Sequence, residues 1–327
     1  MPDWKPKTTA DSAPGAQPSP DSKAAPLEVN DSAVIRPHSC KSRKSDADSN
    51  PWLWVPTIYI AEGIPYMIAM TVSVVLYKNL GLSNTEIALY TSWLYLPWVI
   101  KPLWSPFVDL FRTKRFWILF MQLMIGASFA CVALTLPATD LVRYTLAMFW
   151  IMAFSSATHD IAADGFYMLG LDTPQQAAFV GVRTVFYRMA TIASKGGLVI
   201  MAGFLQKYGY PVASAWSLTF LIAAAVFLAL CLYHFFVLPH PASDRHAPRD
   251  KGRSLITEYF RILTMFFRRK DIMIIICFFL FYRFAEAQLV KMVAPFLLDA
   301  RANGGLGLAT AEVGIIYGTV GVVALML

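Results

Sequence analysis

The chain has 327 residues, of which 57% are hydrophobic and only 15% are charged. This composition is too apolar for a soluble domain and is typical of a helical protein with several membrane-spanning segments. The apolar runs are about twenty residues long, whereas a membrane β-barrel shows alternating segments of about ten residues. The net charge is +7, but the first 50 residues carry seven acidic and seven basic side chains, so the excess lies in and between the apolar segments. This distribution argues against a nucleic-acid partner.

The first stretch, residues 1–50, is rich in Pro, Ser, Ala and Asp and contains few large apolar residues. Such a segment cannot bury enough surface to offset the entropy of ordering, so we expect a disordered tail. It has no apolar run followed by a small-residue cleavage site, which argues against a signal peptide. Three basic residues directly before the first apolar run predict that this tail is cytoplasmic, namely Lys41, Arg43 and Lys44.

Eight apolar segments follow the tail, and most of them are long enough to be transmembrane helices. They cover about residues 52–78, 85–108, 116–137, 141–168, 177–206, 212–238, 271–298 and 309–327. The connections alternate in charge, with eight Lys and Arg residues in 239–270, three in the turn after the second segment, and about one after each of segments one, three and five. Because short basic loops stay in the cytoplasm, this alternation predicts a multi-pass protein with a cytoplasmic N-terminus.

The basic residues 239–270 divide the chain after six segments. Within them, Ser254 to Phe267 has apolar residues at helical spacing with basic residues between them. This pattern predicts an amphipathic helix on the cytoplasmic membrane surface. We therefore predict a six-helix bundle over 51–238, a basic cytoplasmic linker over 239–270 and the start of a second bundle over 271–327.

An internal repeat relates the two predicted bundles. The first apolar segment and its exit read Ala61-Glu62-Gly63 and then Gly81-Leu82-Ser83-Asn84-Thr85-Glu86, and the seventh reads Ala285-Glu286-Ala287 and then Gly307-Leu308-Ala309-Thr310-Ala311-Glu312. Both copies begin with a helix that leaves from the cytoplasmic side, so the repeat is parallel. Parallel repeats of six helices are found in one large class of secondary transporters.

Several motifs resemble the major facilitator superfamily, and within it the AmpG-type permeases and the related acetyl-CoA transporters. The turn from Asp109 to Arg115 resembles the superfamily motif between helices 2 and 3 without its glycines. The pattern Lys101-x-Leu103-Trp104-x-Pro106-x-x-Asp109 resembles the AmpG-type version. The stretch Asp160-Ile161-Ala162-Ala163-Asp164-Gly165 resembles the helix 4 signature, and Tyr187-Arg188 with Gly196-Gly197 resembles the start of helix 5.

The resemblance implies an all-α integral membrane protein with the complete six-helix N-terminal half of the major facilitator fold and the first two helices of the C-terminal half. It implies a secondary active transporter that imports a solute such as anhydro-muropeptide across the bacterial inner membrane by alternating access. The expected energy source is the proton gradient, with no cofactor and no metal, and the expected partners are a small-molecule solute, protons and the lipid bilayer. We expect a monomer, and, because the last apolar segment runs to Leu327 without a basic stop, a truncated chain or a fragment.

Three alternatives stay open. The solute could be another anionic or sugar-linked molecule, as in the acetyl-CoA transporters, or the chain could be a fragment without activity. The third alternative is an intramembrane enzyme built on His159 and Asp160. No second His lies within a helix of His159 in the sequence, and the sequence contains no Gly-x-Ser-x-Gly motif, so we expect no enzyme activity.

The stretch from Lys101 to Arg115 closes the second apolar segment and opens the third. Asp109 lies just before a basic cluster that includes Arg112, so an acid and several cations meet at the mouth of two helices. A turn that only fixes topology needs the cations but not the acid, and charges at a membrane edge tend to be functional. We therefore predict a gate that includes Lys101, Asp109, Arg112 and Arg115.

Two aspartates in the fourth segment share one helix face, because Asp160 and Asp164 are four residues apart. The helical rise puts them near the cytoplasmic end, where Arg183 and Arg188 open the fifth segment. One interpretation is a structural ion pair that closes the turn between these helices. The other is a latch, shared with Arg112, that breaks when the cytoplasmic side opens.

Glu62 lies near the middle of the first segment, beside Gly63 and Pro65, which loosen the helix. A charged and unpaired carboxylate at this depth is costly, so Glu62 should carry a proton or find a partner such as Lys195 or Lys291. Glu286 is its counterpart in the repeat. We predict that Glu62, Glu286, Lys195 and Lys291 serve proton coupling or solute binding, with Glu62 the most important; a helix–helix hydrogen bond is the alternative for each glutamate.

Overall fold

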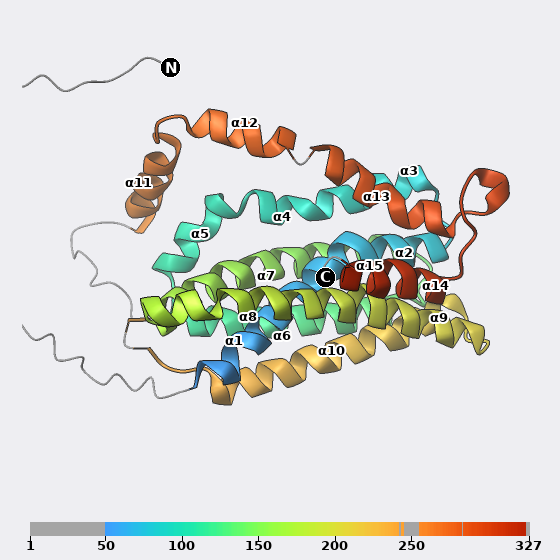
Figure 1. Cartoon of the computed structure of the whole chain (residues 1–327), viewed down its shortest axis with the longest axis horizontal. Helices are drawn as coiled ribbons and strands as arrows, with labels where there is room; N and C mark the ends of the chain where they lie inside the picture. The colour runs from blue at the N-terminus through green and yellow to red at the C-terminus, as the bar shows by residue number, and fades with distance from the viewer. Residues whose placement is uncertain (1–49, 242, 245–254, 283, 325–327) are drawn as a thin grey trace, which may run out of the picture. The chain divides into compact units, whose positions relative to one another are not determined.

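The computed structural model describes residues 50–241, 243–244, 255–282 and 284–324, and every regular element in these ranges is a helix (Figure 1). Residues 1–49 of the predicted tail and residues 245–254 of the predicted basic linker lie outside the described residues.

The eight predicted segments correspond to eight helical runs, several of them built from more than one element. In chain order these runs are α1 (Pro51–Met67), η1 (Ile68–Val72) and α2 (Ser73–Asn79); α3 (Asn84–Ser92), η2 (Trp93–Tyr95), α4 (Leu96–Val99) and α5 (Lys101–Leu110); α6 (Lys114–Thr135); α7 (Leu141–Gly170); α8 (Thr173–Ile192), η3 (Ala193–Leu198) and α9 (Val199–Lys207); α10 (Val212–Val237); α12 (Ile272–Tyr282) and α13 (Phe284–Leu298); and α14 (Thr310–Val313), η5 (Gly314–Val320) and α15 (Gly321–Ala324). The predicted amphipathic helix is α11 (Leu255–Phe267), and the short turn η4 (Arg301–Asn303) precedes α14.

Four helical runs in the described part are long and apolar enough to cross a membrane without interruption, namely Pro51–Asn79, Lys114–Thr135, Thr173–Lys207 and Val212–Val237. The second predicted segment is not one continuous helix, because the chain bends at Ile100 between α4 and α5. Pro102 has no N–H to donate to the carbonyl of Trp98, and its ring crowds that carbonyl, so the α-helix cannot continue there.

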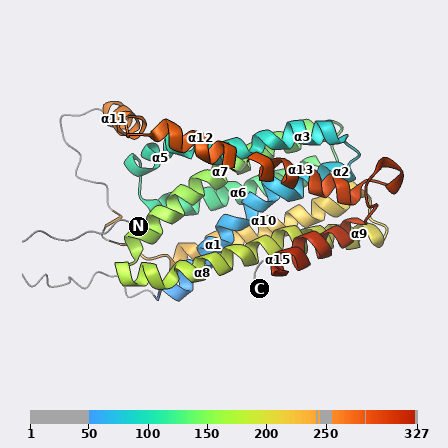
Figure 2. The same cartoon turned by 45° about the horizontal axis from the view of Figure 1, so that its top comes forward.

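The helices of the first six runs pack side by side. α6 lies against both α7 and α10, and α1 lies against α7 and α8 (Figures 1 and 2). Fully buried aromatic side chains fill the centre of this bundle, among them Tyr77, Phe129, Phe149, Trp216 and Phe220. Between apolar helices in a lipid environment, close packing of such side chains replaces the hydrophobic effect as the main source of stability.

Three short π-helical turns, η1, η3 and η5, lie next to one another, although they come from the first, fifth and eighth runs. Glycines allow this approach, since a Cβ at Gly318 would collide with the backbone of Lys195. A Cβ at Gly314 would likewise come within 2.8 Å of the backbone nitrogen of Ile200. π-helical turns are frequent at functional sites because the extra residue turns side chains out of the regular helical register.

Candidate functional site

Two buried or half-buried carboxylates of α7 bind cations from two different helices. Asp160 is 7% exposed and accepts from the Lys101 ammonium at 2.5 Å and from the Trp98 indole N–H at 3.1 Å. Asp164, one helical turn further along, accepts from the Arg183 guanidinium at 2.9 Å and from the Tyr59 hydroxyl at 3.2 Å. The two carboxylates therefore belong to separate ion pairs, one with α5 and one with α8.

The pairing differs from the prediction at Asp160. Both aspartates share a face of α7, as expected, but the rise of one turn brings each opposite a different neighbouring helix. Asp160 meets Lys101 instead of an arginine of α8, and its side chain is buried rather than close to water. Arg188 takes part in none of the ion pairs formed by the described residues.

Glu62 of α1 lies close enough to these two ion pairs to feel the charges of Asp160, Asp164, Lys101 and Arg183. Its Oε2 atom is enclosed and accepts no hydrogen bond from any described residue. The neighbouring Gly63 lets α1 approach α8 closely, since a Cβ there would lie 2.8 Å from the Cβ of Ala190. Together these residues form what we call the acidic cluster, defined as Glu62, Asp160, Asp164, Lys101 and Arg183.

Lys195 and Lys291 do not pair with Glu62. The Lys195 ammonium lies 4.6 Å from the centre of the Tyr317 ring, and the Lys291 ammonium donates to the backbone carbonyl of Thr91 at 3.1 Å. Both lysines line a separate cavity of about 320 Å³, together with Glu286. Three of the four residues predicted for coupling or solute binding thus meet at one cavity, and Glu62 belongs to the other cluster.

The side chains around this cavity come from both parts of the repeat. Tyr66, Met70 and Thr71 of the first run, Tyr95 of the second and Lys195 of the fifth face Glu286 and Lys291 of the seventh. Met70 and Thr71 belong to η1 and Lys195 to η3, so two of the three π-helical turns present side chains to the cavity. The lining combines aromatic and thioether surface with charged groups, a mixture typical of small-molecule sites.

At the turn between α5 and α6, Asp109 forms an ion pair with Lys114, a member of the basic cluster that follows it in the sequence. The Lys114 side chain passes over Gly165 of α7, where a Cβ would come within 2.9 Å of its Cε atom. Arg112 instead lies over the Phe116 ring, 5.6 Å from its centre, and has a backbone φ of 67°. This is the left-handed region, in which a glycine would be unstrained.

Arg115 joins the start of α6 to the end of α10. Its guanidinium donates to the carbonyls of Phe235 at 2.5 Å and Leu238 at 3.2 Å. In return, the carboxylate of Asp244, just after α10, accepts from the backbone N–H groups of Lys114 at 2.7 Å and Arg115 at 3.1 Å. A cation at a helix C-terminus and an anion at a helix N-terminus both complement the helix dipoles. Both contacts tie the start of α6 to the end of α10, so Arg115 has a structural role here, and its gating role stays a prediction.

A buried polar chain lies beside the acidic cluster, and the sequence did not reveal it. Gln122 of α6 contacts the His159 imidazole at 3.0 Å and the His234 imidazole at 2.9 Å, and His234 also contacts the Thr57 hydroxyl at 2.9 Å. The sequence has no second histidine within a helix of His159, but α10 brings His234 within one side chain of it. The contacting residues are 37 to 177 positions apart in the sequence, so no local spacing could have shown this.

At the opposite end of the helices, a group of residues that we call the Asp299 cluster joins the first two runs to the seventh and eighth. The Asp299 carboxylate binds the Lys78 ammonium at 2.6 Å and the Asn84 amide at 2.8 Å. The hydrogen bond from Asn84, followed by the interactions with Lys78, lowers the pKa of Asp299 below its usual value. The cluster also includes Asn79 and Thr310, described next.

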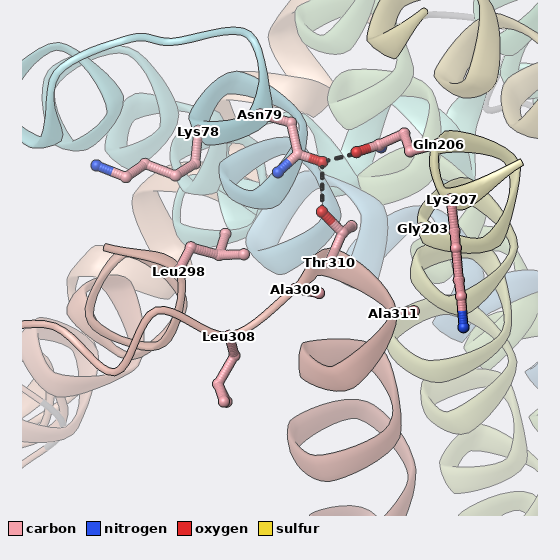
Figure 3. A pocket seen from close by; sticks show the side chains of 10 residues that line it. All are labelled: Lys78, Asn79, Gly203, Gln206, Lys207, Leu298, Leu308, Ala309, Thr310 and Ala311. Atoms are coloured by element: carbon pink, nitrogen blue, oxygen red, sulfur yellow. Dashed lines mark hydrogen bonds between the residues drawn. The ribbon is translucent and has the colours of Figure 1, made fainter. Parts of the chain in front are cut away.

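Figure 3 shows that Asn79 is a shared acceptor at this end. Its side-chain oxygen accepts from Gln206 at 3.2 Å, from the Trp216 indole at 3.1 Å and from the Thr310 hydroxyl at 3.0 Å. The first two donors belong to the first six runs, whereas Thr310 opens the eighth. These side chains line or adjoin a pocket of about 400 Å³, where a Cβ at Gly203 would collide with Ala311.

None of the residues of the Asp299 cluster was predicted. One available signal was the pair of opposite charges, Lys78 and Asp299, at the ends of corresponding helices of the repeat. The amide partners carry no comparable signal, because Asn residues near turns are common for local reasons.

The sequence profile of the family described as "Major Facilitator Superfamily" matches residues 57–327. Similar curated proteins include the "Anhydromuropeptide permease" of Escherichia coli (strain K12), 25% identical over 232 residues that cover 69% of this chain and 43% of the relative. Another is the "Putative transporter AmpG 4" of Rickettsia conorii, 22% identical over 280 residues that cover 81% of this chain and 62% of the relative. The chain thus spans less than two thirds of the length of these relatives.

Among solved structures, a bacterial homologue of the human lysosomal transporter Spinster, described as inward-facing and unoccupied, superposes with a TM-score of 0.58. It is 18% identical, and the match covers 81% of this chain and 58% of that chain. At this identity the similarity establishes the fold alone.

Proposed function

Because this chain belongs to the major facilitator superfamily, we propose that it acts in proton-coupled import of a small solute by alternating access. The relatives named as an anhydromuropeptide permease and an AmpG transporter support a cargo such as anhydro-muropeptide and a location in the bacterial inner membrane. A different anionic or sugar-linked solute, as in the acetyl-CoA transporters, is the alternative cargo.

The charge balance of the acidic cluster carries the coupling proposal. Among the described residues, the acidic cluster combines three carboxylates, those of Glu62, Asp160 and Asp164, with two cations, Lys101 and Arg183. Both cations are held in ion pairs with the aspartates. An additional uncompensated charge inside a membrane protein is costly. Glu62 is the carboxylate left over, with an enclosed oxygen that accepts no hydrogen bond from the described residues. It is therefore the group on which a transported proton can reside.

Replacing Glu62 by Gln tests this assignment, because Gln keeps the size of the side chain but cannot release a proton. We expect the Glu62→Gln variant to lose accumulation of solute against a gradient in membrane vesicles, while exchange of labelled for unlabelled solute continues. Glu286→Gln should have the smaller effect. The matched control is Asp140→Asn, which neutralises an exposed carboxylate without a capping hydrogen bond. Unchanged accumulation and pH dependence in Glu62→Gln would refute the assignment.

The cavity with two lysines supports an anionic cargo. In the described part of the chain neither Lys195 nor Lys291 forms an ion pair, so both ammonium groups are available to a carboxylate or phosphate of the solute. We expect Lys195→Gln and Lys291→Gln to raise the solute concentration needed for half-maximal uptake. Labelled anhydro-muropeptide and labelled acetyl-CoA, supplied separately and in competition, distinguish the two candidate cargoes.

Alternating access requires contacts that form in one state and break in the other. We propose that the Asp299 cluster closes the outer side. We further propose gate or latch roles on the cytoplasmic side for Lys101, Asp109, Arg112, Asp160, Asp164, Arg183 and Arg188. The orientation is tested with an impermeant thiol reagent on Ser22→Cys and Ser243→Cys in intact cells, where neither position should react.

A further inference from the structure

The helix α11 crosses the direction of the bundle helices at the end where α5 stops (Figures 1 and 2). It packs against α5, and the Tyr259 hydroxyl donates a hydrogen bond to the backbone carbonyl of Leu103. Helices that span a membrane run along the bundle, so an attached helix in this transverse position lies in the plane of the membrane surface.

One side of α11 is apolar and uncovered. Tyr259, Ile262 and Phe266 are half-buried, and Tyr259 contacts α5 through its hydrogen bond to Leu103. Ile256 and Phe260, by contrast, are 68% and 57% exposed, and Phe267 is 46% exposed. In a helix these three side chains point to similar directions, since they are four and seven residues apart. An exposed apolar stripe of this kind is stable where it contacts acyl chains.

Three consecutive cations follow this stripe. Arg268, Arg269 and Lys270 are exposed, and none of them takes part in an ion pair with another described residue. Asp271 comes next, in the left-handed backbone conformation with φ 62°, and α12 begins directly after it. The turn from α11 into α12, residues 268–271, therefore has a net charge of +2.

We propose that this elbow, made of the apolar stripe of α11 and the cations 268–270, binds the headgroup of an anionic phospholipid. The stripe would contact the acyl chains while the guanidinium and ammonium groups bind the phosphate, as charge complementarity at a membrane surface favours. A basic turn that only fixes topology needs the cations but not the exposed stripe beside them. The inference rests on the membrane location of the proposed function but not on transport or on proton coupling.

The test measures lipid bound to the purified full chain in detergent by native mass spectrometry, with phosphatidylglycerol and phosphatidylcholine compared. The triple variant Arg268→Gln, Arg269→Gln, Lys270→Gln removes the cations. The matched control replaces three exposed cations elsewhere by Gln, namely Arg143, Lys207 and Arg301. Each basic residue near an anionic surface contributes about 1 kcal/mol, or about a factor of five, so the triple variant should weaken phosphatidylglycerol binding on the order of 100-fold.

The control variant should keep its preference for phosphatidylglycerol over phosphatidylcholine. Phe260→Ser should weaken the binding of both lipids, because it removes a contact with their acyl chains, without changing the preference for phosphatidylglycerol. Thermal unfolding of each variant checks that the fold is retained. The proposal is overturned if the parent chain shows no preference for phosphatidylglycerol, or if the control variant loses as much binding as the triple variant. It is also overturned if inorganic phosphate displaces the lipid at equal concentration, since the site would then recognise free phosphate. Transport assays of Glu62→Gln are independent of all these outcomes.

Discussion

The substitution Asp299→Asn tests whether the ion pair between Asp299 and Lys78 stabilises the state in which the outer side is closed. Asn keeps the size of the side chain but removes the charge that binds Lys78 at 2.6 Å. The two charged side chains are 17% and 19% exposed, so the pair is neither fully buried nor free in solvent. Exposed pairs contribute up to about 1 kcal/mol and hydrogen bonds to charged groups about 1.5–3 kcal/mol.

We expect the lower part of that range, about 1–2 kcal/mol, because Lys78 keeps its hydrogen bond to the Asn84 side chain at 2.6 Å. If the ion pair forms only when this end is closed, its loss raises the ratio of open to closed molecules by a factor of about 5–30. Asn79 contributes less to this difference, because it keeps the hydrogen bonds from Gln206 and Trp216 when Thr310 leaves.

A cysteine at Thr71 reports this opening, since Thr71 is 4% exposed and lines the cavity. In a background without the native cysteines, an impermeant maleimide should label Thr71→Cys about 5–30 times faster when Asp299→Asn is present. Asp140→Asn should leave the rate unchanged. Lys78→Met should act like Asp299→Asn, and the two together should add little, because each breaks the same pair. Equal rates in Asp299→Asn and the parent, or fully additive effects, would refute the reasoning.

Further predictions concern pH, backbone strain and close packing. Because the pKa of Asp299 is lowered, its contribution to closure is present above the usual value of 3.8 and is lost only as the pH falls through the lowered pKa. The ratio of the Thr71→Cys labelling rates with and without Asp299→Asn, in which the change of thiolate fraction with pH cancels, should therefore be constant from about pH 5 to 8. At Arg112, with φ 67°, Gly should be tolerated, whereas Val should lower the free energy of unfolding by about 1–2 kcal/mol in thermal or denaturant melts. Gly203→Val should increase the labelling of Thr71→Cys from outside, because the valine side chain would collide with Ala311 in the closed state. An unchanged labelling rate would mean that Gly203 and Ala311 stay in contact in the open state as well. Asp109→Asn should reduce uptake without reducing the amount of protein in the membrane, and normal uptake would leave the turn with a topological role only.

The helices and their order were largely predictable, because the length of an apolar run is a direct physical requirement for crossing a membrane. The sixth predicted segment, 212–238, differs from α10 (Val212–Val237) by a single residue. The superfamily and its all-helical fold were also predictable from the motifs of the second, fourth and fifth segments. The bend at Ile100 was missed although its cause, Pro102, is visible in the sequence.

The side-chain pairs were harder to predict, because a helix surrounded by lipid and by other apolar helices has no polar face from which its orientation can be read. Lys101 binds Asp160, Asp109 binds Lys114 and His234 reaches His159 through Gln122, and each pair depends on which helix faces meet. Depth alone could be estimated, from the helical rise. It put Glu62 near the middle of its helix but could not reveal that Lys195 and Lys291 belong to a separate site.

The exchange of contacts between α6 and α10 bears on how the protein is made. Arg115 caps the end of α10, and Asp244 caps the start of α6, so the third and sixth helices complete each other. Nothing after residue 244 contributes to these bonds. A nascent chain can therefore finish the first six-helix unit while the later helices are still being synthesised, in keeping with the tendency of N-terminal units to fold first. The later helices α13 and α14 then reach surfaces of α2, α3 and α9 that are already assembled.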